Sequence, residues 1–145
     1  MINPFFKNNG PFKIDRLLAL SNINNKNNLK KLKVTDIKDL DTAKNNDITF
    51  FHSRKYEHIA SKTNASFCLT TSSLSKILPD SCNKIIVDNV LINTAKITKI
   101  FYPNSDTDDF DPNVKEIKKT NYKDKVKFGK NVLIGKNVNI GKNCL

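Results

Sequence analysis

The residues best suited to acid–base chemistry in this sequence are its two histidines, His52 and His58. An imidazole can act as a general base because its ordinary pKa lies near neutral pH. Neither histidine belongs to a recognisable catalytic pattern, since the chain has no G-x-S-x-G elbow, no Walker phosphate loop and no cysteine–histidine dyad. We therefore interpret both as surface or helix residues and predict no catalytic residue in this chain.

The three cysteines, Cys68, Cys82 and Cys144, lie far apart and form no C-x-x-C pair. An odd number of cysteines at such spacing argues against a disulfide framework and against a zinc site. We predict buried or incidental thiols, and no bound metal.

Charge is the most unusual feature of the composition. The 145 residues carry a formal net charge of +11, with 38% hydrophobic and 27% charged residues, which is typical of a soluble globular protein. Almost all the positive charge is lysine spread along the chain, and arginine occurs only at Arg16 and Arg54. Proteins that read nucleic acids usually rely on the bidentate arginine fork. We therefore favour a solvated lysine surface over nucleic-acid binding, and attraction to an anionic ligand or membrane remains an alternative.

Apolar runs are short throughout, so we predict no membrane span. The first residues also lack the apolar region of a secretory signal. The expected compartment is the cytoplasm.

An internal repeat closes the sequence. From Val126 it reads VKFGKN, VLIGKN and VNIGKN, followed by Cys144 and Leu145, with four columns in six-residue register. This short period is typical of parallel β-helix coils, in which an aliphatic column points inward and Gly-Lys-Asn corners accept positive φ angles. A β-meander with Gly-Lys-Asn hairpins, or a lysine-rich tail, fits the strict register less well. Three hexads make about one coil, so we expect the chain to end where a β-helix has barely begun.

Upstream of the repeat, apolar patterns alternate between strand and helix signals, which indicates a small α/β domain. We predict a short helix near residues 14–21, a strand and turn within 34–40, strands at 48–51, 66–70 and 84–88, a helical stretch at 54–61, a short helix from Ser72-Ser73 through Leu78, and a longer helix over 91–101. The expected organisation is an α/β domain over 1–103, a linker over 104–111 and the start of the β-helix over 112–145.

Several segments resemble one family in order and spacing. Residues 40–50 resemble a family pattern in which a Leu and an Ala precede a strand similar to Gly-Asp-Ile-Ser-Phe. Residues 53–56, Ser-Arg-Lys-Tyr, stand where the family favours Asn-Pro-Lys-Tyr. Residues 63–66 resemble the family's Thr-x-Ala-x-Ala step into the next strand. Residues 87–89, Ala95 and the Phe-Tyr-Pro at 101–103 resemble its third strand and closing helix. Together with the hexads, they make the chain resemble the UDP-3-O-(3-hydroxyacyl)glucosamine N-acyltransferases of lipid A biosynthesis. This sequence departs from that pattern at Asn46, Ser53 and Arg54, where the family usually has Gly, Asn and Pro.

The resemblance implies an N-terminal uridine-binding domain followed by a left-handed β-helix. It also implies a uracil ring held between Phe50 and Tyr56. Ser53 and Lys55 are further candidates for substrate binding, because a serine can still donate one hydrogen bond and Lys55, like Arg54, could attract a diphosphate. The alternative for Lys55 and Arg54 is that they are solvated basic residues. Stacking a base on an aromatic face contributes about 1–3 kcal/mol. Because neighbouring strand residues face opposite ways, the resemblance selects Phe50, and not Phe51, as the ring that meets ligand. The alternative is that Phe50 is a core strand residue and Tyr56 an ordinary helix residue.

The implied reaction moves a 3-hydroxyacyl group from acyl carrier protein to the 2-amino group of UDP-3-O-acylglucosamine. The carrier-protein thioester is the donor, no further cofactor is needed, and the full-length family member is a homotrimer. Its catalytic histidine lies on a later coil that nothing here matches, so we expect this chain alone to be inactive. The alternative function is a non-catalytic binding module for a uridine sugar nucleotide or an anionic partner.

Overall fold

The computed structural model describes residues 6–24, 32–103, 105, 126–130, 132, 134, 140 and 141. The chain divides into two compact units, Met1–Ser105 and Asp106–Leu145. The first unit contains every helix and strand assigned among the described residues.

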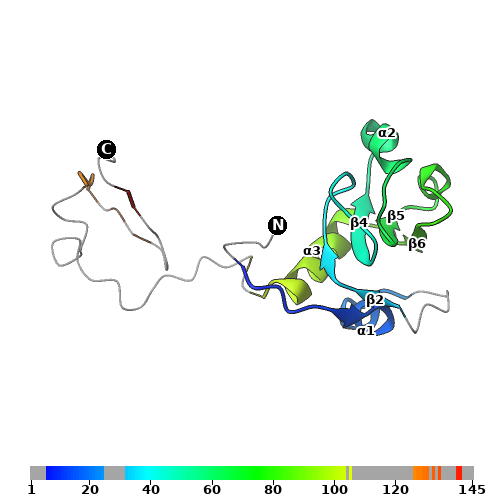
Figure 1. Cartoon of the computed structure of the whole chain (residues 1–145), viewed down its shortest axis with the longest axis horizontal. Coiled ribbons are helices and arrows are strands. Elements are labelled where there is room, and N and C mark those ends of the chain that lie inside the picture. The colour runs from blue at the N-terminus through cyan, green and yellow to red at the C-terminus, as the bar shows by residue number, and fades with distance from the viewer. Residues whose placement is uncertain are drawn as a thin grey trace. The chain divides into compact units, whose positions relative to one another are not determined.

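A four-stranded parallel sheet organises the first unit. Its strands are β3 (Asp36–Ile37), β4 (Asp47–Phe51), β5 (Phe67–Thr70) and β6 (Asn83–Ile86), and they lie side by side in chain order (Figure 1). Short helical segments connect them: η1 (Arg54–Tyr56) and α2 (Glu57–Ala60) join β4 to β5, and η2 (Ser75–Ile77) joins β5 to β6. The predicted strands at 48–51, 66–70 and 84–88 are thus confirmed, with ends that differ by one or two residues.

Two further helices flank the sheet on one face. The helix α1 (Ile14–Leu20) and the longer α3 (Val90–Phe101) confirm the helices predicted at 14–21 and 91–101. The side chain of Asn89 accepts a hydrogen bond from the amide of Ile92 (3.0 Å) and caps the start of α3. The helix ends at Phe101, two residues before Pro103, as the restriction on residues preceding proline predicts.

Alternation along β4 and β5 divides the interior into two cores. Ile48, Phe67 and Leu69 face α1 and α3, whereas Phe51 and Cys68 face the connecting segments on the other side of the sheet. The first core consists of Ile14, Leu17, Leu18, Ile23, Val34, Ile48, Phe67, Leu69, Ile85, Val87, Val90, Ile97 and Phe101. The second consists of Leu40, Phe51, Ala60, Cys68, Leu74, Leu78 and Cys82. Because both faces of the sheet are covered, its strands are apolar on both sides, as is usual for parallel sheets.

The short helix predicted from Ser72-Ser73 through Leu78 is found only as a shorter 3-10 segment, and its predicted serine N-cap is wrong. Residues 72–74 form a turn, and only the 3-10 segment η2 follows. Its N-cap position is Leu74, which makes no side-chain capping bond. The hydroxyls that suggested a cap bond locally instead, because Ser75 Oγ donates to the Ser72 carbonyl at 2.8 Å and Thr71 Oγ1 lies 3.1 Å from Ser73 Oγ.

A second, smaller sheet was not predicted. The strand β1 (Phe12–Lys13) pairs antiparallel with β2 (Lys33–Val34). Each has two residues, which is too short for an alternating pattern to appear in the sequence.

The predictions for the second unit concern mostly residues outside the described ones. The linker over 104–111 lies there almost entirely, as do most residues of 112–145. No strand is assigned at the hexad residues that the structure describes. The β-helix therefore remains a prediction from the repeat.

Among the described residues, no helix combines the length and apolarity needed to cross a membrane.

Candidate functional site

Three aromatic side chains form a row at the carboxyl end of β4. The ring centroid of His52 lies 6.4 Å from that of Phe50, with 27° between the two planes. The ring centroid of His52 also lies 5.6 Å from that of Tyr56, with 46° between the planes. Both separations are in the range of aromatic rings in contact. We call Phe50, His52 and Tyr56 the aromatic row.

The strand and the turn after it place these rings. Phe50 and His52 are two residues apart, so the alternation of an extended chain puts them on the same side. The chain then turns at Ser53, whose hydroxyl accepts a bond from the Lys55 amide at 3.4 Å, and the Tyr56 amide donates to the Ser53 carbonyl at 3.1 Å. This turn begins η1 and brings Tyr56 back toward the end of the strand.

The turn also accounts for the departures from the family pattern. Ser53 is the N-cap of η1, a position that both serine and asparagine fill well. Arg54 is the first residue of η1, where the fixed φ of proline is favourable but not required. Replacing Asn-Pro by Ser-Arg therefore keeps the local fold, while Arg54 adds an exposed guanidinium.

Phe50 and Phe51 lie in different environments. Phe51 is fully buried in the second core. Phe50 is partly exposed and packs against the edge of the first core. Of the two rings, Phe50 is therefore the one with surface left to offer a ligand, while part of it serves the core.

Tyr56 and Lys55 are accessible. The Tyr56 side chain is 37% exposed, and the Lys55 ammonium lies 5.9 Å from the centre of its ring. That distance is at the limit of a cation–π contact. A base stacked on Tyr56 would thus have a mobile positive charge beside it.

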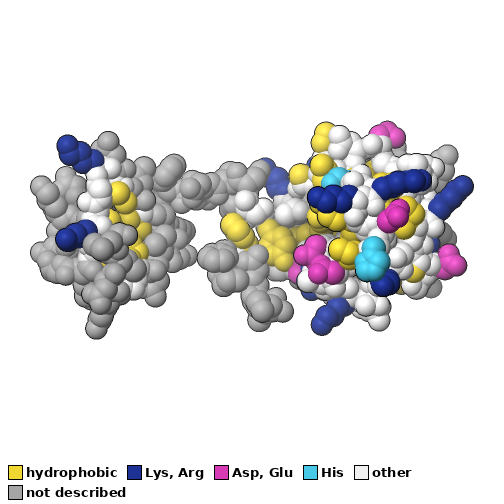
Figure 2. All heavy atoms as spheres, turned by 90° about the horizontal axis from the view of Figure 1, so that it is seen from above, with side chains coloured by type: hydrophobic (Ala, Val, Ile, Leu, Met, Phe, Trp, Pro, Cys, Tyr) yellow, Lys and Arg dark blue, Asp and Glu magenta, His cyan; other side chains and the backbone are white. Residues whose placement is uncertain are grey.

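The surface around the site carries charges of both signs. Figure 2 shows basic, acidic and histidine side chains interspersed over the visible face of the larger unit. On this face there is no single-sign stripe of the kind that follows a nucleic-acid backbone.

Among the site residues, sequence reasoning missed His52. We interpreted both histidines as surface or helix residues, and His58 fits this, because it is exposed on α2 with Nε2 3.2 Å from Nζ of Lys62. His52 is also exposed, but its ring contacts both of the predicted stacking rings. The sequence signal that could have identified His52 was its position two residues after Phe50, because side chains two residues apart in an extended chain lie on the same side.

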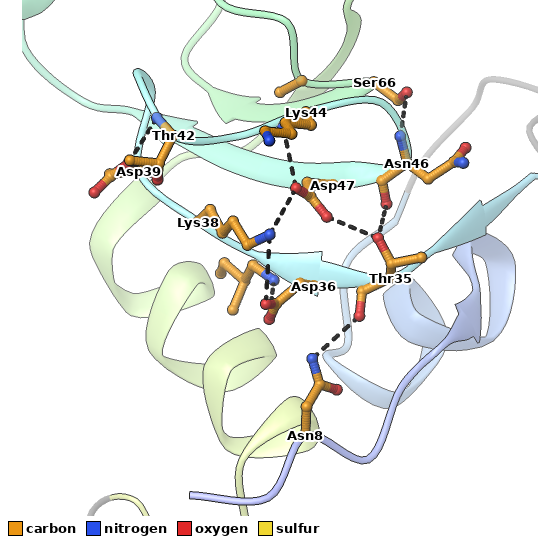
Figure 3. A network of polar contacts seen from close by, with 12 residues as sticks. Asn8, Thr35, Asp36, Lys38, Asp39, Thr42, Lys44, Asn46, Asp47 and Ser66 are labelled. Atoms are coloured by element: carbon orange, nitrogen blue, oxygen red, sulfur yellow. Dashed lines mark hydrogen bonds and ion pairs between the residues drawn. The ribbon is translucent and has the colours of Figure 1, made fainter. Parts of the chain in front are cut away.

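The amino end of β4 carries a different kind of polar cluster (Figure 3). The carboxylate of Asp47, with 4% of its side chain exposed, accepts bonds from Thr35 Oγ1 (2.7 Å), Lys38 Nζ (3.1 Å) and the Lys44 amide (3.0 Å). Every oxygen of this carboxylate is therefore engaged by its own chain. We interpret Asp47 as a structural residue that ties β3 and the preceding turn to β4.

Asn46 supports the same turn. Its φ of 68° is in the left-handed region, where glycine costs least and asparagine is the best-tolerated substitute. This explains why Asn can stand where the family usually has Gly. The backbone N–H of Asn46 also donates a hydrogen bond to Ser66 Oγ at 2.8 Å.

The cluster reaches the end of α3 through Asp36. The Tyr102 hydroxyl donates to Asp36 Oδ1 at 2.5 Å, and Nδ2 of Asn8 lies 3.4 Å from the same hydroxyl. Burial, with the bond to Asp36 next, raises the pKa of Tyr102 to about 12. These contacts fasten the N-terminal segment and α3 to the sheet edge.

No group of three or more His, Cys, Asp or Glu side chains suited to a metal occurs in the part of the chain that the structure describes. The described cysteines are two free buried thiols, Cys68 and Cys82. The aromatic row lies beyond the carboxyl end of β4, and in parallel sheets ligands usually bind beyond the carboxyl ends of the strands.

Comparison with known proteins bears on this region. Residues 31–100 match the profile of the family described as UDP-3-O-(3-hydroxymyristoyl) glucosamine N-acyltransferase, LpxD. A search of curated proteins finds no match. The matched range contains the whole parallel sheet and the aromatic row, and it supports this family for the N-terminal region.

Proposed function

Taking the family match of residues 31–100 as the premise, we propose that this region recognises the uridine of a sugar nucleotide for an acyltransferase of lipid A biosynthesis. The substrate we propose is a UDP-3-O-acylglucosamine, with acyl carrier protein as the acyl donor and no further cofactor. In this proposal the hexads belong to a left-handed β-helix, and the assembled enzyme is a cytoplasmic homotrimer.

The observation that supports the proposal is that Phe50 and Tyr56 both contact His52 at the carboxyl end of β4. Phe50 precedes the turn at Ser53 and Tyr56 follows it. Each keeps some exposed surface. Aromatic faces arranged in this way suit a flat base, because stacking needs only two planes and little hydrogen-bonding specificity.

Positive charge next to the rings suits the rest of such a ligand. Lys55 lies over Tyr56, and Arg54 is exposed one residue earlier. A diphosphate attached to a base on Tyr56 would lie within reach of flexible cationic side chains, which gain from charge-assisted bonds to phosphate. Ser53 keeps a hydroxyl proton to donate, because its oxygen acts as acceptor toward the Lys55 amide.

Calorimetric titration of the 145-residue chain with UDP-N-acetylglucosamine tests the proposal. We expect saturable binding that Tyr56→Ala weakens by about 5- to 150-fold, the equivalent of one stacking contact. The matched control is Ile59→Ala, because Ile59 is on α2 and is 39% exposed, close to the 37% of Tyr56. Absence of binding by the unmodified chain, or equal losses in both variants, would refute the proposed site.

A further inference from the structure

The position of His52 has a consequence for how a base could enter the site. Its ring contacts both Phe50 and Tyr56, at centroid distances of 6.4 and 5.6 Å. Rings at such separations touch each other. In the ligand-free chain, the imidazole therefore covers aromatic surface on both walls of the proposed site.

A base and this imidazole cannot share that surface. Stacking a base between Phe50 and Tyr56 requires that one face of each ring be free. His52 is a planar aromatic ring that already contacts both of them. It thus occupies part of the space that the base would need.

His52 is also free to move. It follows the last residue of β4 and its side chain is exposed. Exposed side chains change rotamer within picoseconds to nanoseconds, so leaving the row requires no rearrangement of the fold. What is lost on leaving is the contact with two rings, which opposes binding by about two- to tenfold.

We propose that His52 is a displaceable plug that fills the base-stacking space between Phe50 and Tyr56 until a nucleotide base replaces it. The inference rests on the proposed function, since a plug has meaning only where a base binds. It makes His52 a residue that sets affinity without adding a contact to the bound base. Arg54, Lys55 and Ser53 keep their positions on the turn while the imidazole swings out.

The first test measures the affinity of the full 145-residue chain for UDP-N-acetylglucosamine after His52→Ala. The plug predicts binding about two- to tenfold tighter than in the unmodified chain, because the competing ring is gone. His58→Ala is the matched control, since His58 contacts Lys62 and not the row, and we expect no change in affinity. Weaker binding after His52→Ala would show that the imidazole is a stacking partner and would overturn the inference, as would an unchanged affinity.

The second test does not depend on affinity. In the proton spectrum of the free chain, ring currents from Phe50 and Tyr56 should move the imidazole resonances of His52 away from their ordinary positions. Those of His58 should stay near them. Tyr56→Ala should move only the His52 signals, and saturation with the nucleotide should return them toward ordinary positions. Unshifted His52 signals in the free chain would overturn the plug.

The two tests separate this inference from the proposed function. If the nucleotide binds and the His52 signals stay as they were, the function stands and the plug is wrong. If both chains bind, the His52→Ala variant more tightly, and the nucleotide returns the His52 signals toward ordinary positions, both stand. If neither chain binds but the ring-current shifts are present, the proposed function fails, and displacement by a nucleotide fails with it.

Discussion

Asp47 should contribute more to stability than any exposed carboxylate of the chain, and Asp47→Ala measures that contribution. The carboxylate is almost completely buried and accepts three hydrogen bonds, from a hydroxyl, an ammonium and a backbone amide. Lys38 keeps 33% of its side chain exposed and Thr35 is exposed, so both can bond to water after the change, at a cost of about 1 kcal/mol or less each. The Lys44 amide loses a charged acceptor, which costs about 1.5–3 kcal/mol.

Summing these contributions gives an expected loss of about 1.5–5 kcal/mol in the free energy of unfolding. Asp47→Asn should lose roughly half as much, because an amide oxygen still accepts one bond while its NH2 group meets the Lys38 ammonium. Urea denaturation followed by circular dichroism measures both values, and an unchanged denaturant slope shows that the folded and unfolded states are otherwise alike.

The control is Asp80→Ala. Asp80 is fully exposed and lies 3.8 Å from Lys84, so its removal should leave stability unchanged within error. If Asp47→Ala costs less than about 0.5 kcal/mol, or no more than Asp80→Ala, then the carboxylate does not tie β3 to β4 and the structural interpretation of this cluster is wrong.

Three other features give measurable outcomes. Because Asn46 has φ 68°, Asn46→Gly should leave the unfolding free energy within about 0.5 kcal/mol, whereas Asn46→Val should lower it by about 1–2 kcal/mol; equal effects would contradict the backbone argument. Burial and the bond to Asp36 raise the pKa of Tyr102 to about 12, above the ordinary value of about 10 that it has in the unfolded chain. The unfolded state then loses its proton first, so stability should fall as the pH rises from about 10 to about 12, and Tyr102→Phe should remove the highest tyrosinate absorbance step. In a Cys144→Ser chain, a thiol reagent should label neither Cys68 nor Cys82 until urea unfolds the protein, since their side chains are 0% and 1% exposed; rapid native labelling would contradict their placement.

The longer elements could be predicted because their patterns are long enough to be distinctive. The apolar runs of β4 and β5 and the periodic side of α3 each extend over four or more residues. The two-residue strands β1 and β2 have no such pattern, and their pairing is set by contacts between distant segments. The turn before η2 was misread because serine hydroxyls can cap a helix or bond locally, and only the fold decides between these.

Prediction of the candidate site was likewise partial. The resemblance selected Phe50 and Tyr56, and the structure brings both into contact with a single third ring. His52 was not predicted as a site residue, because histidine was considered only as an acid–base group and not as a flat aromatic ring that can contact other rings. Its role depends on the turn at Ser53, which folds Tyr56 back over the strand end. The spacing of residues along β4 predicts which side chains share a face of the strand. It does not predict that the chain turns back at Ser53 and brings Tyr56 to the end of the strand.

The most direct test of the central claim is a titration of the isotope-labelled chain with UDP-N-acetylglucosamine, followed in its amide correlation spectrum. If the base binds at the aromatic row, the amides of residues 50–56 should shift with a common saturation curve. Those of Thr35 and Asn46, which precede β3 and β4 at the amino end of the sheet, should remain in place. Amide shifts confined to the Asp47 cluster, or no amide shifts at all during the titration, would contradict binding at the aromatic row.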